Sequence, residues 1–102
     1  MLTTPARTIR LAREGIDRLL PLLHDGEGAR RIGLVNDELR AILGDAVNGA
    51  RVPVDMIHIE EMRDIVGAVC LNGHLCVEHF EEASDLCTAM REIGLQVEDT
   101  IE

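Results

Sequence analysis

The chain contains no lysine, tryptophan or tyrosine, and Phe80 is its only aromatic residue. Proteins rich in β-structure usually place aromatic side chains on their strands, so this scarcity argues against a predominantly β fold. Good helix formers such as leucine, alanine, glutamate and arginine are plentiful. Because 46% of the 102 residues are hydrophobic, we expect a helical protein whose core is built from aliphatic side chains.

Long apolar runs are also missing. No stretch approaches the length needed to cross a membrane, and the opening sequence MLTTPARTIR lacks the apolar segment of a signal peptide. Three cysteines form no regular disulfide framework, which favours reduced thiols. We therefore expect one cytoplasmic domain over residues 1–102, with no membrane association.

Charge is distributed unevenly along the chain. Residues 1–51 contain eight arginines and seven acidic residues, for a net charge of +1, whereas residues 52–102 contain two arginines and twelve acidic residues, for a net charge of −10. The total of −9 predicts repulsion from nucleic acid and from anionic membranes. The acidic half would instead attract a basic surface on another protein.

Four segments have apolar residues at alternating spacings of three and four, the pattern of a helix with one buried face. Their stripes are Ile9, Ala12, Ile16, Leu19 and Leu23; Ile32, Val35, Leu39, Ile42 and Ala46; Ile59, Met62, Val66 and Val69; and Cys76, Phe80, Ala83, Cys87 and Met90. Short connections make neighbouring helices antiparallel, so we predict an all-α antiparallel bundle of about four helices.

Residues with known preferences for helix ends mark the expected boundaries. Thr4 and Pro5 fit the N-cap and first position of the first helix, and Asp55 fits the N-cap of the third. Pro21 should kink or end the first helix. The second helix is expected to end at Asn48-Gly49 and the fourth at Gly94, which leaves 94–102 as a flexible tail or as a segment docked through Leu95, Val97 and Ile101.

An α+β alternative remains open at this stage. Residues 65–80 also fit a β-hairpin with Asn72-Gly73 as its two-residue turn, and residues 54–60 alternate like a short strand. The helical spacing that continues from Cys76 to Met90 favours helix, turn and helix over the hairpin.

Two cysteines and two histidines fall in the stretch CLNGHLCVEH at 70–79, namely Cys70, His74, Cys76 and His79. Their spacing matches no established zinc pattern, so we expect no metal and no cofactor. A Cys/His metal-binding or redox accessory protein is retained as an alternative, as is a small thiol enzyme that uses Cys70 with His74. Metalloprotease, di-iron and phosphate-loop motifs are absent, and we expect no enzymatic activity.

Some apolar residues lie outside the four stripes. Leu11 and Leu22 share one face of the first helix, roughly opposite Ile9 and Ile16, with Gly15 and Arg18 beside them. A monomer rarely exposes a large apolar patch, so we expect a homodimer or a partner surface here. The predicted interface residues are Leu11, Gly15, Arg18, Leu22, Leu86 and Ile93, and the predicted acidic docking face is Glu78, Glu81, Glu82 and Asp85.

In size, acidity and helicity the chain resembles small bacterial regulators that bind and silence larger proteins. This resemblance is one of class and no specific motif supports it. It implies a regulatory protein that binds and modulates or inhibits another protein, such as an antiactivator of a quorum-sensing transcription factor of the LuxR type. A toxin-immunity protein is the second alternative.

Overall fold

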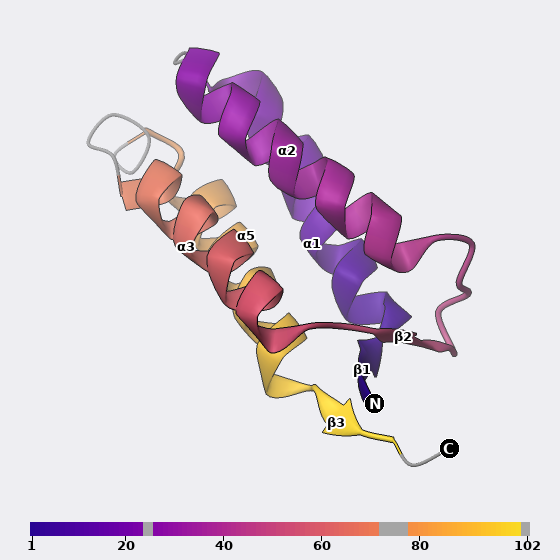
Figure 1. Cartoon of the computed structure of the whole chain (residues 1–102). Coiled ribbons are helices and arrows are strands. Elements are labelled where there is room, and N and C mark those ends of the chain that lie inside the picture. Colours follow the sequence, from indigo (N-terminus) through magenta and orange to yellow (C-terminus); the bar gives the residue numbers. More distant parts are fainter. Residues whose placement is uncertain (24–25, 72–77, 101–102) are drawn as a thin grey trace.

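Four helices run antiparallel to their neighbours in the computed structural model, which describes residues 1–23, 26–71 and 78–100 (Figure 1). The chain is 74% helical. Each helix contacts two others, in the cyclic order α1, α2, α3 and α5. The helices are α1 Ala6–Leu19, α2 Gly26–Leu43, α3 Met56–Leu71 and α5 Phe80–Leu95. The predicted helical bundle is confirmed, and a small sheet is added to it.

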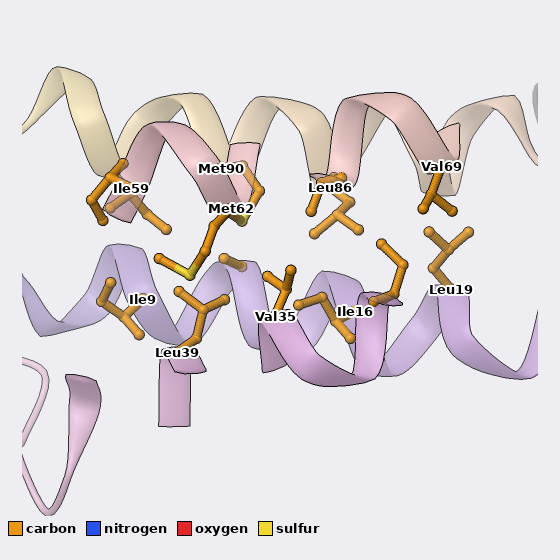
Figure 2. Close-up of a cluster of buried hydrophobic side chains, with 14 of the residues drawn as sticks. Ile9, Ile16, Leu19, Val35, Leu39, Ile59, Met62, Val69, Leu86 and Met90 are labelled. Atoms are coloured by element: carbon orange, nitrogen blue, oxygen red, sulfur yellow. The ribbon is translucent and has the colours of Figure 1, made fainter. Parts of the chain in front are cut away.

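The core lies between two layers, with α1 and α2 on one side and α3 and α5 on the other (Figure 2). Side chains such as Ile16 and Val35 from the first layer face Met62 and Leu86 from the second. The predicted stripes of the first three helices are buried almost as expected, with Leu23, Ile42 and Ala46 only partly covered. Periodicity alone therefore located three of the four buried faces.

The buried face of α5 differs from the prediction. Its buried residues are Ala83, Leu86, Met90 and Ile93. Phe80, expected in the core, is 65% exposed, and Cys87 is only half-buried. The helix is rotated so that Leu86 meets α1 at Gly15, where a Cβ atom would lie 3.5 Å from the Leu86 Cα.

Two helix ends follow the sequence prediction. α1 ends at Leu19 and continues into a 3₁₀ turn, η1 (Leu20–Leu22), because Pro21 has no N–H to continue the α-helical hydrogen bonds. At the start of α3, the Asp55 carboxylate accepts a hydrogen bond from the Ile57 N–H at 2.9 Å. The predicted cap at Asp55 is thereby confirmed.

Three other predicted ends are wrong. α2 ends at Leu43 rather than at Asn48-Gly49, and Gly44 follows it with a φ of +53°, the left-handed conformation that favours glycine. Gly94 lies inside α5, which continues to Leu95. Thr4 does not cap α1, because it belongs to a strand and its hydroxyl donates a hydrogen bond to the Ile93 carbonyl at 3.0 Å.

A three-stranded antiparallel sheet closes one end of the bundle (Figure 1). Its strands are β1 Leu2–Pro5, β2 Arg51–Pro53 and β3 Glu98–Asp99, in the order β2-β1-β3. β1 pairs Thr4 with Val52 on one side and Thr3 with Glu98 on the other. Part of the expected flexible tail over 94–102 is thus a strand, held by backbone hydrogen bonds.

The hairpin alternative is wrong for the described part of 65–80, because residues 65–71 continue α3 and Phe80 begins α5. Residues 72–77, which contain the proposed Asn72-Gly73 turn, lie outside the described residues. Residues 56–60, expected to be a strand in the same alternative, form the first turns of α3. Alternation over so few residues also fits a helix with a wide apolar face.

Arg51 connects the sheet to the end of α5. Its guanidinium donates hydrogen bonds to the Thr3 hydroxyl at 2.9 Å, the Thr3 carbonyl at 3.0 Å and the Gln96 carbonyl at 2.9 Å. We expect Arg51→Ala to lower the free energy of unfolding by about 1–2 kcal/mol, since hydrogen bonds from charged donors are lost at a partly buried site. Urea denaturation measures this change, and Arg40→Ala on the exposed side of α2 is the control. Equal stability of the two variants would contradict the prediction.

Candidate functional site

A groove of about 280 Å³ runs along the contact between α1 and α5. Leu11, which is 45% exposed, supplies its main apolar surface from α1. The groove, here called the α1–α5 groove, is lined by Thr8, Leu11, Arg18, Asp85, Thr88, Ala89 and Glu92. Residues 11 and 18 on α1 are two turns apart, as are residues 85 and 92 on α5, so each helix presents a row along one edge.

Charges in the α1–α5 groove are largely unpaired within the chain. Among the described residues, neither Arg18 nor Asp85 takes part in an ion pair. The Glu92 carboxylate accepts a hydrogen bond from the Gln96 side-chain amide at 2.9 Å. An apolar centre with a cation on one helix and carboxylates on the other can therefore receive a ligand of complementary charge.

The predicted interface residues divide into two groups. Leu11 and Arg18 are exposed and line the groove, and Leu22 is half-buried in η1. Leu86 and Ile93 are wrong as surface residues, because both side chains are 0% exposed in the core. Gly15 is also buried, and it contacts Leu86 of its own chain. At this glycine the backbone of α5 approaches α1 closely within the single chain.

The predicted acidic face lies beside the groove at the start of α5. Glu78, Glu81 and Asp85 are exposed, and Glu82 is half-buried. Glu81 and Asp85 lie one turn apart and form one row with Thr88 and Glu92. Thr88 and Glu92 were not part of the predicted acidic face. The sequence could have predicted this row, because positions 81, 85, 88 and 92 are separated by four, three and four residues and so share one helix face.

The Cys/His cluster is only partly described. His74 and Cys76 lie outside the described residues, so their predicted relation to Cys70 has no structural account here. His79 immediately precedes α5, and its Nε2 lies 4.0 Å from the Glu78 carboxylate. Within the described ranges, no group of three or more histidine, cysteine, aspartate or glutamate side chains is arranged to hold a metal ion.

A different cysteine pair lies between α3 and α5. The Cys70 thiol, 3% exposed, donates a hydrogen bond to the sulfur of Cys87, and this bond is the main reason why the pKa of Cys87 falls from 9.0 to about 7. Burial opposes the shift, and the positive charge of Arg91 adds to it. Helical spacing had placed Cys87 on the apolar stripe of the last helix, and it contains no information about a neighbour on α3.

Cys87 opens onto a second groove, here called the thiol groove, of about 230 Å³. It is lined by Arg63, Asp64, Val66, Gly67, Cys87, Met90 and Arg91. Nothing lies within 4 Å of the position that a Cβ atom of Gly67 would occupy, which leaves open space on this side of α3. The arrangement presents a half-buried thiol to solvent beside Arg91, while the Arg63 guanidinium lies nearer Gly94.

Comparison of the chain with models of protein families, with curated proteins and with solved structures finds no match of any of the three kinds. In the described part of the chain, no helix has both the length and the apolar character that crossing a bilayer requires. The features that bear on function are therefore the surface residues of the α1–α5 groove and the thiol groove.

Proposed function

We propose that this protein is a regulatory module that binds a partner protein through the α1–α5 groove. The observation that supports this function is the position of exposed Leu11 between Arg18 on α1 and two carboxylates, Asp85 and Glu92, on α5. Apolar anchors surrounded by charged rims are typical of protein-binding surfaces.

The proposed partner element is an amphipathic helix with an apolar residue flanked by arginine or lysine. A helix of this kind would place its apolar side chain against Leu11 and its cations beside Asp85 and Glu92. Glu81 and Asp85, which form no ion pair with any described residue, extend the acidic row along α5. Affinity would come from the apolar contact, while the acidic row would increase the association rate and select for basic partners.

Binding of this kind can regulate a larger protein by covering a surface that the larger protein needs. We therefore propose an inhibitory role of the antiactivator type, with a bacterial transcription factor such as a LuxR-type regulator as the class of target. Immunity to a toxin would use the same surface chemistry. The identity of the partner decides between these two roles.

A second copy of the chain is the competing occupant of the groove. The exposed row of α1 itself combines Leu11 with Arg7 and Arg18, which is the chemistry proposed for the partner helix. A two-fold dimer would place this row against the acidic row of its mate. We propose that such a homodimer forms in the absence of the partner and that partner binding displaces it.

The first test compares Leu11→Asp with Leu34→Asp. Both leucines are large exposed apolar residues, but Leu34, at 51% exposed, lies on α2 away from the groove. We expect Leu11→Asp to reduce the amount of partner captured from extracts of the native cell by on the order of tenfold or more, as for an interface anchor. Leu34→Asp should capture as much partner as the wild type.

Static light scattering on the same variants, with Leu22→Asp alongside, tests the dimer. A wild type that is dimeric at micromolar concentration and monomeric after Leu11→Asp supports the proposed face. Equal capture by the Leu11 and Leu34 variants would refute the groove as the binding surface. Transcription by the captured regulator, assayed with and without the protein, then tests inhibition.

A further inference from the structure

Two thiols from different helices lie in direct contact at the boundary between α3 and α5. Cys70 is in the last turn of α3, and Cys87 is in the middle of α5. Val66 and Gly67, one turn before Cys70 on α3, line the thiol groove together with Cys87, and the Cys70 thiol lies within hydrogen-bond reach of the Cys87 sulfur. Cys70 is enclosed by the core, whereas Cys87 faces the thiol groove. The pair thus has one accessible and one shielded member.

The surroundings of Cys87 favour its anionic form. The thiol groove is lined by Arg91 from α5, whose positive charge lowers the Cys87 pKa, together with Arg63 and Asp64 from α3. Because its pKa is about 7, roughly half of Cys87 is a thiolate at neutral pH. Thiolate is the form of cysteine that attacks electrophiles, and partial exposure lets small molecules reach it.

We infer that Cys87 is a site of reaction with small hydroperoxides and that Cys70 is its resolving partner. The product is a disulfide that links α3 to α5. The volume of the thiol groove limits the oxidant to a small molecule such as hydrogen peroxide or a short alkyl hydroperoxide. Arg91 would also stabilise the negative charge that develops on the leaving oxygen.

The chemistry balances in two steps. In the first, the Cys87 thiolate attacks the distal oxygen of the hydroperoxide; an S–O bond forms, the O–O bond breaks, and the departing oxygen takes a proton from solvent and leaves as alcohol or water. The sulfur is thereby oxidised to a sulfenic acid and the peroxide is reduced. In the second, the Cys70 sulfur attacks the sulfenic sulfur; an S–S bond forms, the S–O bond breaks, and hydroxide leaves as water with the Cys70 proton.

This inference is independent of the proposed function. The thiol groove and the α1–α5 groove share no lining residue and lie on different sides of α5. Loss of partner binding after Leu11→Asp would leave thiol chemistry unchanged. Loss of thiol chemistry after Cys87→Ser would likewise leave the α1–α5 groove intact.

The test uses the full chain with Cys76→Ser, which leaves only Cys70 and Cys87, and treats it with dilute hydrogen peroxide. Digestion with trypsin and a glutamate-specific protease cuts after Glu78, Glu82 and Arg91, so Cys70 and Cys87 fall on separate peptides. We expect mass spectrometry to find these two peptides joined, with loss of two hydrogen atoms. The wild type should give the same cross-link.

Variants at position 70 separate resolution from activation. Cys70→Ser keeps a hydroxyl donor beside Cys87 but removes the resolving sulfur, so dimedone should trap a sulfenic acid at Cys87. Cys70→Ala removes the donor as well, and we expect iodoacetamide to alkylate Cys87 more slowly than in Cys70→Ser at neutral pH. Circular dichroism of each variant confirms that the helices remain folded.

The charge contribution is tested by the pH dependence of Cys87 alkylation in the Cys70→Ser, Cys76→Ser background. We expect Arg91→Gln to slow this reaction about fivefold at pH 7 by raising the thiol pKa, and Arg40→Gln on α2 to leave the rate unchanged. A Cys87 that reacts with peroxide no faster than glutathione would overturn the inference. So would oxidation that produces only a disulfide to Cys76, only links between two chains, or no cross-link.

Discussion

Replacing Leu86 by alanine is expected to lower the free energy of unfolding by about 3 kcal/mol, near the lower end of the range for buried leucines. The side chain is 0% exposed and contacts α1 at Gly15. Part of the resulting cavity would be bordered by the α1 backbone, which cannot collapse into it as a flexible side chain can. The cavity cost therefore adds to the lost burial of apolar surface. Urea denaturation followed by circular dichroism measures the change.

Leu34→Ala is the matched control, because it removes the same atoms from an exposed site on α2, outside the α1–α5 groove. Its effect on the free energy of unfolding should stay within about 0.5 kcal/mol. The burial of Leu86 would be contradicted if both variants changed the free energy of unfolding by a similarly small amount and Leu86→Ala also dissociated a dimer. Leu86 would then belong to the dimer interface, as predicted from the sequence.

A second large effect is expected for Gly15→Leu. A Cβ atom at this position would lie 3.3 Å from the Leu86 Cδ1 and 3.5 Å from the Leu86 Cα, so even one added carbon is tightly confined. A leucine side chain must push α1 and α5 apart, and we expect a loss of about 3 kcal/mol in unfolding free energy. Thermal or urea denaturation shows whether the variant folds with reduced stability or not at all.

Gly33→Leu controls for helix propensity and side-chain size. Nothing lies within 4 Å of the position of a Cβ atom at Gly33 in α2, so this change should be neutral or stabilising by up to about 1 kcal/mol. The double variant Gly15→Leu with Leu86→Ala should be more stable than the sum of its single effects predicts, because the new side chain occupies the vacated volume. Strict additivity would show that the two positions do not meet.

The sequence was sufficient to predict the helices but not the rotation of the last one. On α5, the predicted stripe through Phe80 and Cys87 and the observed stripe through Leu86 and Ile93 share Ala83 and Met90. The observed rotation puts Leu86 against the backbone at Gly15, a contact between residues 71 positions apart (86 − 15). Helical periodicity within one segment contains no information about such a contact.

The sheet was missed for a related reason. Strands of four, three and two residues are too short for an alternating pattern to be recognised. Their pairing joins Leu2 to Asp99, which only the assembled bundle brings together. Local residue preferences did correctly identify Asp55 as a cap and Pro21 as a helix terminator, because both effects depend on neighbouring residues alone.

The candidate site residues could likewise be predicted only within single helices. Leu11 and Arg18 were found because they share a face of α1, and Asp85 was found as part of an acidic run. No pattern within one segment indicates that these residues line one groove. The contact between Cys70 and Cys87 likewise depends on how α3 packs against α5.

The position of β1 between β2 and β3 has a consequence for synthesis on the ribosome. β1 is translated first, but its second neighbour, β3, includes Asp99. At elongation rates of about 5–20 residues per second, roughly 5 to 20 seconds separate the two strands. During that interval one edge of β1 has no partner strand. The part of α1 that packs on α5 in the finished bundle is also uncovered. The nascent chain is therefore exposed to chaperones and to aggregation until its last helix and strand leave the exit tunnel.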